Sequence, residues 1–205
     1  MIYKPTKHLA FIILLQNIYK KTHTQQMAES GECENYNFNV EKPANCEIVR
    51  FEHRKTFNVA GIQDQVLYPE IPVKVPAIIK KFHEKSTEIK NTKDSLSYGV
   101  SFDSSEQGFT FLMGKEVTKA EDLPEGFISR EIPENEYAVI GYKGTKDKVN
   151  DTYIWFSCSW VVENGHEQIT TAPSFEVYDE RCIPEGPDAD KSYFEIYMPI
   201  KKNSQ

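Results

Sequence analysis

Two segments near the C-terminus combine acidic and aromatic residues at a spacing that could bind an organic cation. Residues 174–180 and 193–200 have the composition of β-strands, and a loop rich in Pro, Gly and Asp separates them. Each segment carries a glutamate two positions before a tyrosine: Glu176 with Tyr178, and Glu195 with Tyr197. Because successive side chains of a strand point to opposite faces, each glutamate shares a face with its tyrosine. The carboxylate would supply the opposite charge, and the ring a cation–π contact.

The residues between these positions point to the other face, and they are apolar: Phe175, Val177, Phe194, Ile196 and Met198. If helices cover this apolar face, the face with the glutamates and tyrosines is left to line a groove. The alternative is an ordinary solvated sheet face. Glu195 is the stronger candidate acid, because it stands in the most apolar strand of the chain. A carboxylate buried there needs a partner or a hydrogen bond.

The rest of the chain predicts the elements that position these residues. Apolar periodicity and turn residues indicate, in chain order, a strand at 46–62, a helix at 75–89, strands at 98–102 and 109–117, a strand pair or bent strand at 128–142, and a helix at 149–160. The two C-terminal strands complete a repeated order of strand, helix and hairpin. We therefore predict an α+β fold of tandem duplicated βαββ units, with two antiparallel sheets and one long helix each, enclosing a central groove. The halves span 45–118 and 127–202.

Composition argues against several other functions. The chain has 205 residues, a formal net charge of −7 and 12% aromatic residues, so it can build a sizeable core, and its acidity disfavours direct binding to nucleic acid. Its four cysteines and five histidines follow no metal-binding spacing, and no nucleophile–base set or glycine-rich phosphate loop is recognisable. We predict no catalytic residue, no metal and no cofactor. Lys146, in a run of three lysines, is expected in a solvated loop.

Residues 1–44 are predicted to be a poorly ordered N-terminal extension. Their longest apolar run, at 9–15, is far shorter than the ~20 residues that span a bilayer. Met27 begins a segment that looks more like a conventional protein N-terminus. We expect a cytoplasmic protein with no membrane partner.

A series of short motifs in residues 45–202 resembles the GyrI-like effector-binding domain family, which includes the ligand-sensing domains of AraC-type and multidrug-sensing regulators. The motifs lie at 97–101, 111–117, 122–126, 130–139, 160, 175–181 and 195–200. Each is weak alone, but seven in the order and spacing of the family indicate the fold. The chain looks most like the stand-alone, integron-associated effector-binding proteins.

The resemblance implies a tandem βαββ fold whose groove receives hydrophobic cations on glutamates and aromatic rings. Carried onto this chain, the ligand-binding residues are Glu195, Glu176, Tyr197, Tyr178 and Trp160, with Tyr98, Phe111 and Tyr142 as further lining candidates. Trp160 also continues the apolar stripe of its helix, which is typical of a core residue.

We expect non-catalytic binding of a small, hydrophobic, cationic and aromatic ligand, as a drug or effector receptor or a sequestration module. The first alternative is a GyrI-like hydrolase of reactive small molecules, in which two acids on adjacent strands activate a water. The second is a component of transcription regulation that acts with a separate DNA-binding protein.

Overall fold

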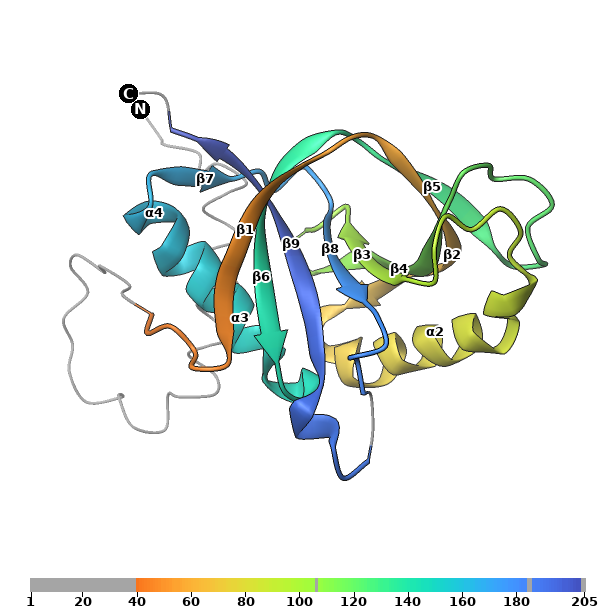
Figure 1. The fold of residues 1–205 in the computed structure, drawn as a ribbon, viewed down its shortest axis with the longest axis horizontal. Coiled ribbons are helices and arrows are strands. Elements are labelled where there is room, and N and C mark those ends of the chain that lie inside the picture. The colour runs from red at the N-terminus through yellow and green to blue at the C-terminus, as the bar shows by residue number, and fades with distance from the viewer. Residues whose placement is uncertain (1–39, 106, 184–185, 204–205) are drawn as a thin grey trace.

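The computed structural model describes residues 40–203 apart from 106 and 184–185. The predicted N-terminal extension lies almost entirely outside the described residues, as does Met27. Figure 1 shows one strongly curved sheet, with α2 (Ile71–Lys85) below its right-hand part and the α3–α4 segment (149–163) beside its left-hand strands. In the described residues, no helix is both long and apolar enough to cross a membrane.

Nine strands form this sheet, and every neighbouring pair is antiparallel. They are β1 (Cys46–Arg54), β2 (Phe57–Leu67), β3 (Ser97–Phe102), β4 (Gly108–Val117), β5 (Ile128–Ile132), β6 (Asn135–Lys143), β7 (His166–Gln168), β8 (Ser174–Tyr178) and β9 (Tyr193–Lys202). The order is β1-β6-β9-β8-β3-β4-β2-β5, with β7 paired to β9. The single strand predicted at 46–62 is wrong, because two strands, β1 and β2, occupy this region. The other predicted strands are present, and β7 was missed.

The prediction of two separate sheets is wrong, because the two halves share one sheet. Strand β3 of the first half pairs with β8 of the second, with Gly99 directly opposite Glu176. Each of these strands would otherwise be an open edge with unpaired backbone groups, so their pairing satisfies both halves at once.

Two helical segments cover one face of the sheet. The first is α2 (Ile71–Lys85), whose first turn contains Pro72, where the missing N–H costs no hydrogen bond. The second runs through α3 (Val149–Trp155), the π-turn η4 (Phe156–Trp160) and α4 (Val161–Glu163). It stops at Gly165, whose φ of 65° is the left-handed conformation that commonly ends helices. The short turns are η1 (Tyr68–Glu70), η2 (Ser86–Glu88), η3 (Lys146–Lys148) and η5 (Ala189–Lys191).

The first strand of each half crosses to the other half. Strand β1 runs into β2 after two residues, yet β1 pairs with β6 whereas β2 pairs with β4 and β5. In the same way β5 pairs with β2, and its continuation β6 pairs with β9. Figure 1 shows both bent segments arching over the top of the molecule.

Each face of the sheet carries a buried core. The core on the helix side includes Phe82, Ile140 and Phe156. The second core lies on the opposite face, inside the curve of the sheet, and includes Tyr137, Val139, Phe175 and Tyr197. Burial raises the pKa of Tyr137 to about 12, so its phenol stays protonated at neutral pH.

Candidate functional site

The two glutamate–tyrosine pairs lie on opposite faces of the sheet. In the β8–β9 ladder, Val177 is directly opposite Glu195, and Glu176 is directly opposite Ile196. Residues directly opposite each other in an antiparallel pair share a face. Glu176 and Tyr178 therefore face the helices, and Glu195 and Tyr197 face the inside of the curve. The expectation that all four line one groove is wrong.

Glu176 is held by two tyrosine hydroxyls from different elements. The Tyr153 hydroxyl, from α3, donates to its Oε1 at 2.7 Å, and the Tyr178 hydroxyl donates to its Oε2. Burial raises the pKa of both phenols well above the usual value, and the neighbouring Glu176 charge raises it further. Both tyrosines therefore stay protonated and act as donors at neutral pH.

Whereas Arg50 pairs with Glu195, no described Lys, Arg or His side chain forms an ion pair with Glu176. Its two hydrogen bonds orient the carboxylate and partly replace water, but they leave its negative charge without a counter-charge. An oriented, half-buried and unpaired carboxylate is a good partner for a cation that arrives from outside.

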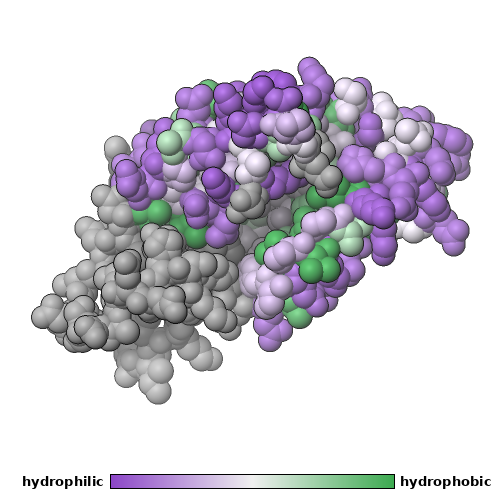
Figure 2. Space-filling view, turned by 90° about the horizontal axis from the view of Figure 1, so that it is seen from below, coloured by the Kyte–Doolittle hydropathy of each residue, from purple (hydrophilic) through white to green (hydrophobic). Residues whose placement is uncertain are grey.

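Small side chains form the floor beside Glu176. Gly99 on β3 stands directly opposite it, and Ser97 and Ser101 alternate onto the same face. A Cβ atom at Gly99 would lie 3.2 Å from both the Phe111 ring and the Tyr178 hydroxyl oxygen. A glycine is therefore needed at position 99, because the Phe111 and Tyr178 side chains close over this part of β3. Figure 2, from below, shows hydrophobic side chains around a hollow beside α2.

Aromatic rings surround Glu176 on the helix side of the sheet, and we call this part of the face the Glu176 groove. Phe111, a predicted lining residue, is buried on the helix side next to Gly99. The Tyr178 ring packs on Phe194, with ring centroids 5.4 Å apart, and Phe194 packs on Tyr142 at 4.9 Å. The Tyr142 hydroxyl donates to the Thr145 carbonyl at 2.7 Å. Tyr142 thus supports the wall from behind.

Lys146 contributes a positive charge to the same wall. Its Nζ lies 3.9 Å from the centroid of the Tyr178 ring and 5.8 Å from that of Phe194. Lys146 is exposed, as predicted, and the η3 turn also directs its side chain over the Tyr178 ring. Burial lowers the pKa of His83 on α2, and the charges of Lys146 and Lys115 lower it further.

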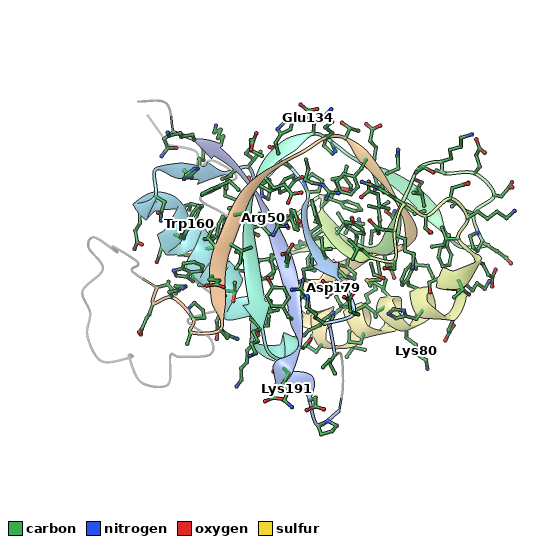
Figure 3. All side chains as sticks on the ribbon, viewed as in Figure 1. Arg50, Lys80, Glu134, Trp160, Asp179 and Lys191 are labelled. Atoms are coloured by element: carbon green, nitrogen blue, oxygen red, sulfur yellow. The ribbon has the colours of Figure 1, made fainter. Side chains whose placement is uncertain are left out.

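On the opposite face, Glu195 already has an internal counter-charge. Arg50 of β1 donates from two guanidinium nitrogens to its two oxygens, at 2.8 and 2.7 Å, and also to the Tyr197 hydroxyl at 2.6 Å. Figure 3 shows Arg50 beside β1. Bidentate pairing of this kind gives both carboxylate oxygens a charged donor. Glu195 and Tyr197 are therefore part of a structural network that attaches β1 to β9.

Tyr98 lies on the same inner face and belongs to a similar network. Its hydroxyl donates to the Glu116 carboxylate at 3.1 Å. Arg54 and Lys93 also reach that carboxylate, at 3.0 and 2.7 Å. The structure therefore places Tyr98 away from the Glu176 groove.

Trp160 lies on the helix side but far along the second helical segment. It stacks on Phe156 at 5.0 Å between ring centroids and on His166 at 5.4 Å, and Phe51 packs at 6.0 Å. Figure 3 shows it on that segment, to the left of β1. Its contacts are those of a core residue that attaches the helix to the sheet.

Tyr153, Gly99 and Lys146 are the site residues that sequence reasoning missed. Tyr153 shares the helical spacing of Phe156 and Trp160, which is typical of an apolar core stripe. Its distinguishing signal is the hydroxyl, since a buried tyrosine needs a hydrogen-bond partner. The role of Gly99 depends on which strand lies opposite, which local pattern does not reveal.

The Arg50–Glu195 pair predicts a specific pH dependence. Hydrogen bonding from Arg50 lowers the pKa of Glu195 below its usual value, more than burial raises it. Stability from this pair is therefore complete above the unfolded-state pKa and is lost as pH falls through the lower folded-state pKa. We expect Glu195→Gln to be less stable than wild type at pH 7, with the difference shrinking between about pH 5 and pH 3. Urea unfolding across this range measures it, and a constant difference would contradict it.

Comparison with known proteins identifies the class of domain. The chain belongs to the family of GyrI-like small molecule binding domains, whose sequence profile matches residues 48–201. It is 27% identical over 152 residues to the transcriptional regulator BrlR of Pseudomonas aeruginosa, which covers 74% of this chain and 54% of BrlR. The chain therefore spans about half the length of that regulator.

Solved structures show the same fold at low sequence identity. SAV2435 bound to tetraphenylphosphonium matches 74% of this chain and 93% of its own, with a TM-score of 0.57 and 12% identity. The C-terminal domain of EcmrR matches 75% and 96%, with a TM-score of 0.55 and 17% identity. The integron cassette protein VCH_CASS2 from the mobile metagenome of Vibrio cholerae matches 77% and 97%, with a TM-score of 0.51 and 16% identity.

Proposed function

We propose that this domain binds a hydrophobic organic cation in the Glu176 groove without transforming it. The observation that carries the proposal is the Glu176 carboxylate, which two tyrosine hydroxyls orient and no described cation pairs. Phe111 and Tyr178 place aromatic rings beside it. A cation with delocalised charge and aromatic substituents suits such a site, because it is weakly hydrated and gains ring contacts as well as charge pairing.

The comparisons support this ligand class. SAV2435 binds tetraphenylphosphonium, a bulky aromatic cation, on the same fold. The similarity to part of BrlR, a transcriptional regulator, favours a role in sensing the ligand. Action on transcription through a separate DNA-binding protein is the form of that role that we propose for this chain.

The hydrolase alternative loses the mechanism on which it depended. That mechanism requires two glutamates on adjacent strands to act on the same water molecule. Glu176 and Glu195 instead lie on opposite faces of the sheet. Glu195 is also occupied by Arg50. Recovery of intact ligand after prolonged incubation with the protein is the expected result, and formation of a product would favour hydrolysis.

Glu176→Gln tests the proposed function, with Glu195→Gln as the matched control on the other face. We expect isothermal titration with tetraphenylphosphonium to show binding about tenfold or more weaker in Glu176→Gln, the ~1.4 kcal/mol scale of a charge-assisted contact. Glu195→Gln also removes one negative charge, from a glutamate that likewise stands two positions before a tyrosine. We expect this variant to bind tetraphenylphosphonium with an affinity within about twofold of wild type.

Two outcomes would contradict the proposed function. One is wild-type protein that does not bind tetraphenylphosphonium. The other is a larger loss in Glu195→Gln than in Glu176→Gln once both variants are shown to be folded by circular dichroism. The second outcome would move the site to the inner face of the sheet.

A further inference from the structure

The Lys146 ammonium lies over the Tyr178 ring, which is the ring that a cationic ligand of the Glu176 groove would contact. Its Nζ is 3.9 Å from the Tyr178 ring centroid, well within the range of about 6 Å for a cation–π contact. The same nitrogen is 5.8 Å from the Phe194 ring. The Tyr178 hydroxyl also donates to Glu176, so the same tyrosine contacts both Lys146 and Glu176. A ligand cation on this ring would meet Lys146.

The backbone on both sides of Lys146 is fixed. Gly144 donates its N–H to the Ser192 carbonyl at 2.8 Å, with a φ of 129° that favours glycine. The Thr145 carbonyl accepts from the Tyr142 hydroxyl at 2.7 Å and from the Lys148 N–H at 3.3 Å. The main chain therefore presents Lys146 at a constant place. Its long side chain can still swing into water, where an ammonium is strongly hydrated.

We propose that Lys146 is a built-in competing cation that sets the specificity of the Glu176 groove. This inference rests on the proposed function and adds which cations the groove accepts. A tethered group acts as a competitor at an effective concentration of about mM. A small alkylammonium ion can make only the cation–π contact with Tyr178 that Lys146 already makes. It therefore competes poorly with the tethered lysine side chain.

A bulky aromatic cation differs from Lys146 in what it gains. Its substituents also contact Phe111 and the small-residue floor at Gly99, and its delocalised charge is easier to remove from water. The Lys146 side chain that it displaces regains its hydration. The groove therefore excludes small amines and selects large, aromatic, weakly hydrated cations.

The test compares Lys146→Ala with Lys148→Ala, which removes the same charge from the other end of the same turn, where the lysine has no aromatic contact among the described residues. Each protein is titrated with tetramethylammonium and with tetraphenylphosphonium. We expect Lys146→Ala to bind tetramethylammonium about tenfold or more tightly than wild type does, and tetraphenylphosphonium only about threefold more tightly. Lys148→Ala should stay within about twofold of wild type for both.

A second measurement observes the side chain directly. Lysines are reductively methylated with ¹³C, and the Lys146 signal is identified by its absence from Lys146→Ala. In the free protein we expect this signal to be shifted by the Tyr178 and Phe194 ring currents. Saturating tetraphenylphosphonium should move it to the position of a solvated lysine.

The outcomes separate this inference from the proposed function. If wild type binds tetraphenylphosphonium through Glu176 but Lys146→Ala gains no affinity for tetramethylammonium, the Lys146 inference fails alone. An unshifted Lys146 signal in the free protein overturns it as well. If binding does not depend on Glu176, the proposed function itself fails. Equal gains in Lys146→Ala and Lys148→Ala would mean that general charge repulsion, not ring occupancy, sets the specificity.

Discussion

Replacing Gly99 with leucine is expected to weaken tetraphenylphosphonium binding by about a hundredfold or more, equivalent to ~2.7 kcal/mol. Even a Cβ atom at this position would lie 3.2 Å from the Phe111 ring and the Tyr178 hydroxyl. Three further carbons would fill the floor opposite Glu176 and displace the Tyr178 hydroxyl that orients its carboxylate. Isothermal titration measures the loss.

Val100→Leu is the matched control for Gly99→Leu. Val100 is the next residue of the same strand, but it is buried in the inner core on the opposite face. Overpacking that core costs about 1–3 kcal/mol of stability and leaves the groove unchanged. We expect a lower melting temperature with retained affinity. Loss of affinity in both variants would mean that strand distortion, not filling of the groove, weakens binding.

Gly61→Ala is expected to cause the largest loss of stability of any substitution considered for this domain, at least about 3 kcal/mol. Gly61 on β2 is directly opposite Gly114 on β4. A Cβ atom at Gly61 would lie 2.5 Å from the Gly114 Cα and 2.7 Å from the Met113 carbonyl carbon. These are backbone atoms, which cannot move aside without separating the strands. The melting temperature should fall by about 6–12 °C.

Gly99→Ala is the control for Gly61→Ala, because it also replaces a strand glycine with alanine. The nearest atoms there belong to the Phe111 and Tyr178 side chains, which can shift by a few tenths of an ångström. We expect its fall in melting temperature to be less than half of that in Gly61→Ala. Equal falls would show that glycine flexibility, rather than close approach of β2 and β4, determines the cost.

The strands and helices could be predicted from local pattern, but the way the halves join could not. Strand alternation, the proline-rich start of α2 and Gly165 at the end of the second helical segment are local signals, and the corresponding elements are present. Whether β3 pairs with β8 depends on contacts between residues such as Gly99 and Glu176, which are distant in sequence. Periodicity carries no information on such pairs.

The same limit explains the outcome for the candidate site. Alternation within each strand correctly placed each glutamate with its tyrosine, but a one-residue change in register moves a strand's side chains to the other face. The β8–β9 register separates Glu176 from Glu195, so only one pair faces the groove. Glu195 ranked higher because its strand is the most apolar. That apolarity reflects burial on both faces, and its charge is matched by Arg50, which is distant in the chain.

The crossing of β1 and β5 between the halves means that neither half is an independent folding unit. A fragment that ends after β4 would lack β6, to which β1 pairs from Cys46 to Arg54, and β5, which covers β2. The contacts that close the sheet join residues far apart in sequence, so loop-closure entropy must be overcome before they stabilise the chain. Folding should therefore be slow and cooperative. A cation bound near the β3–β8 junction would therefore be expected to stabilise both halves together, because the two halves share this junction.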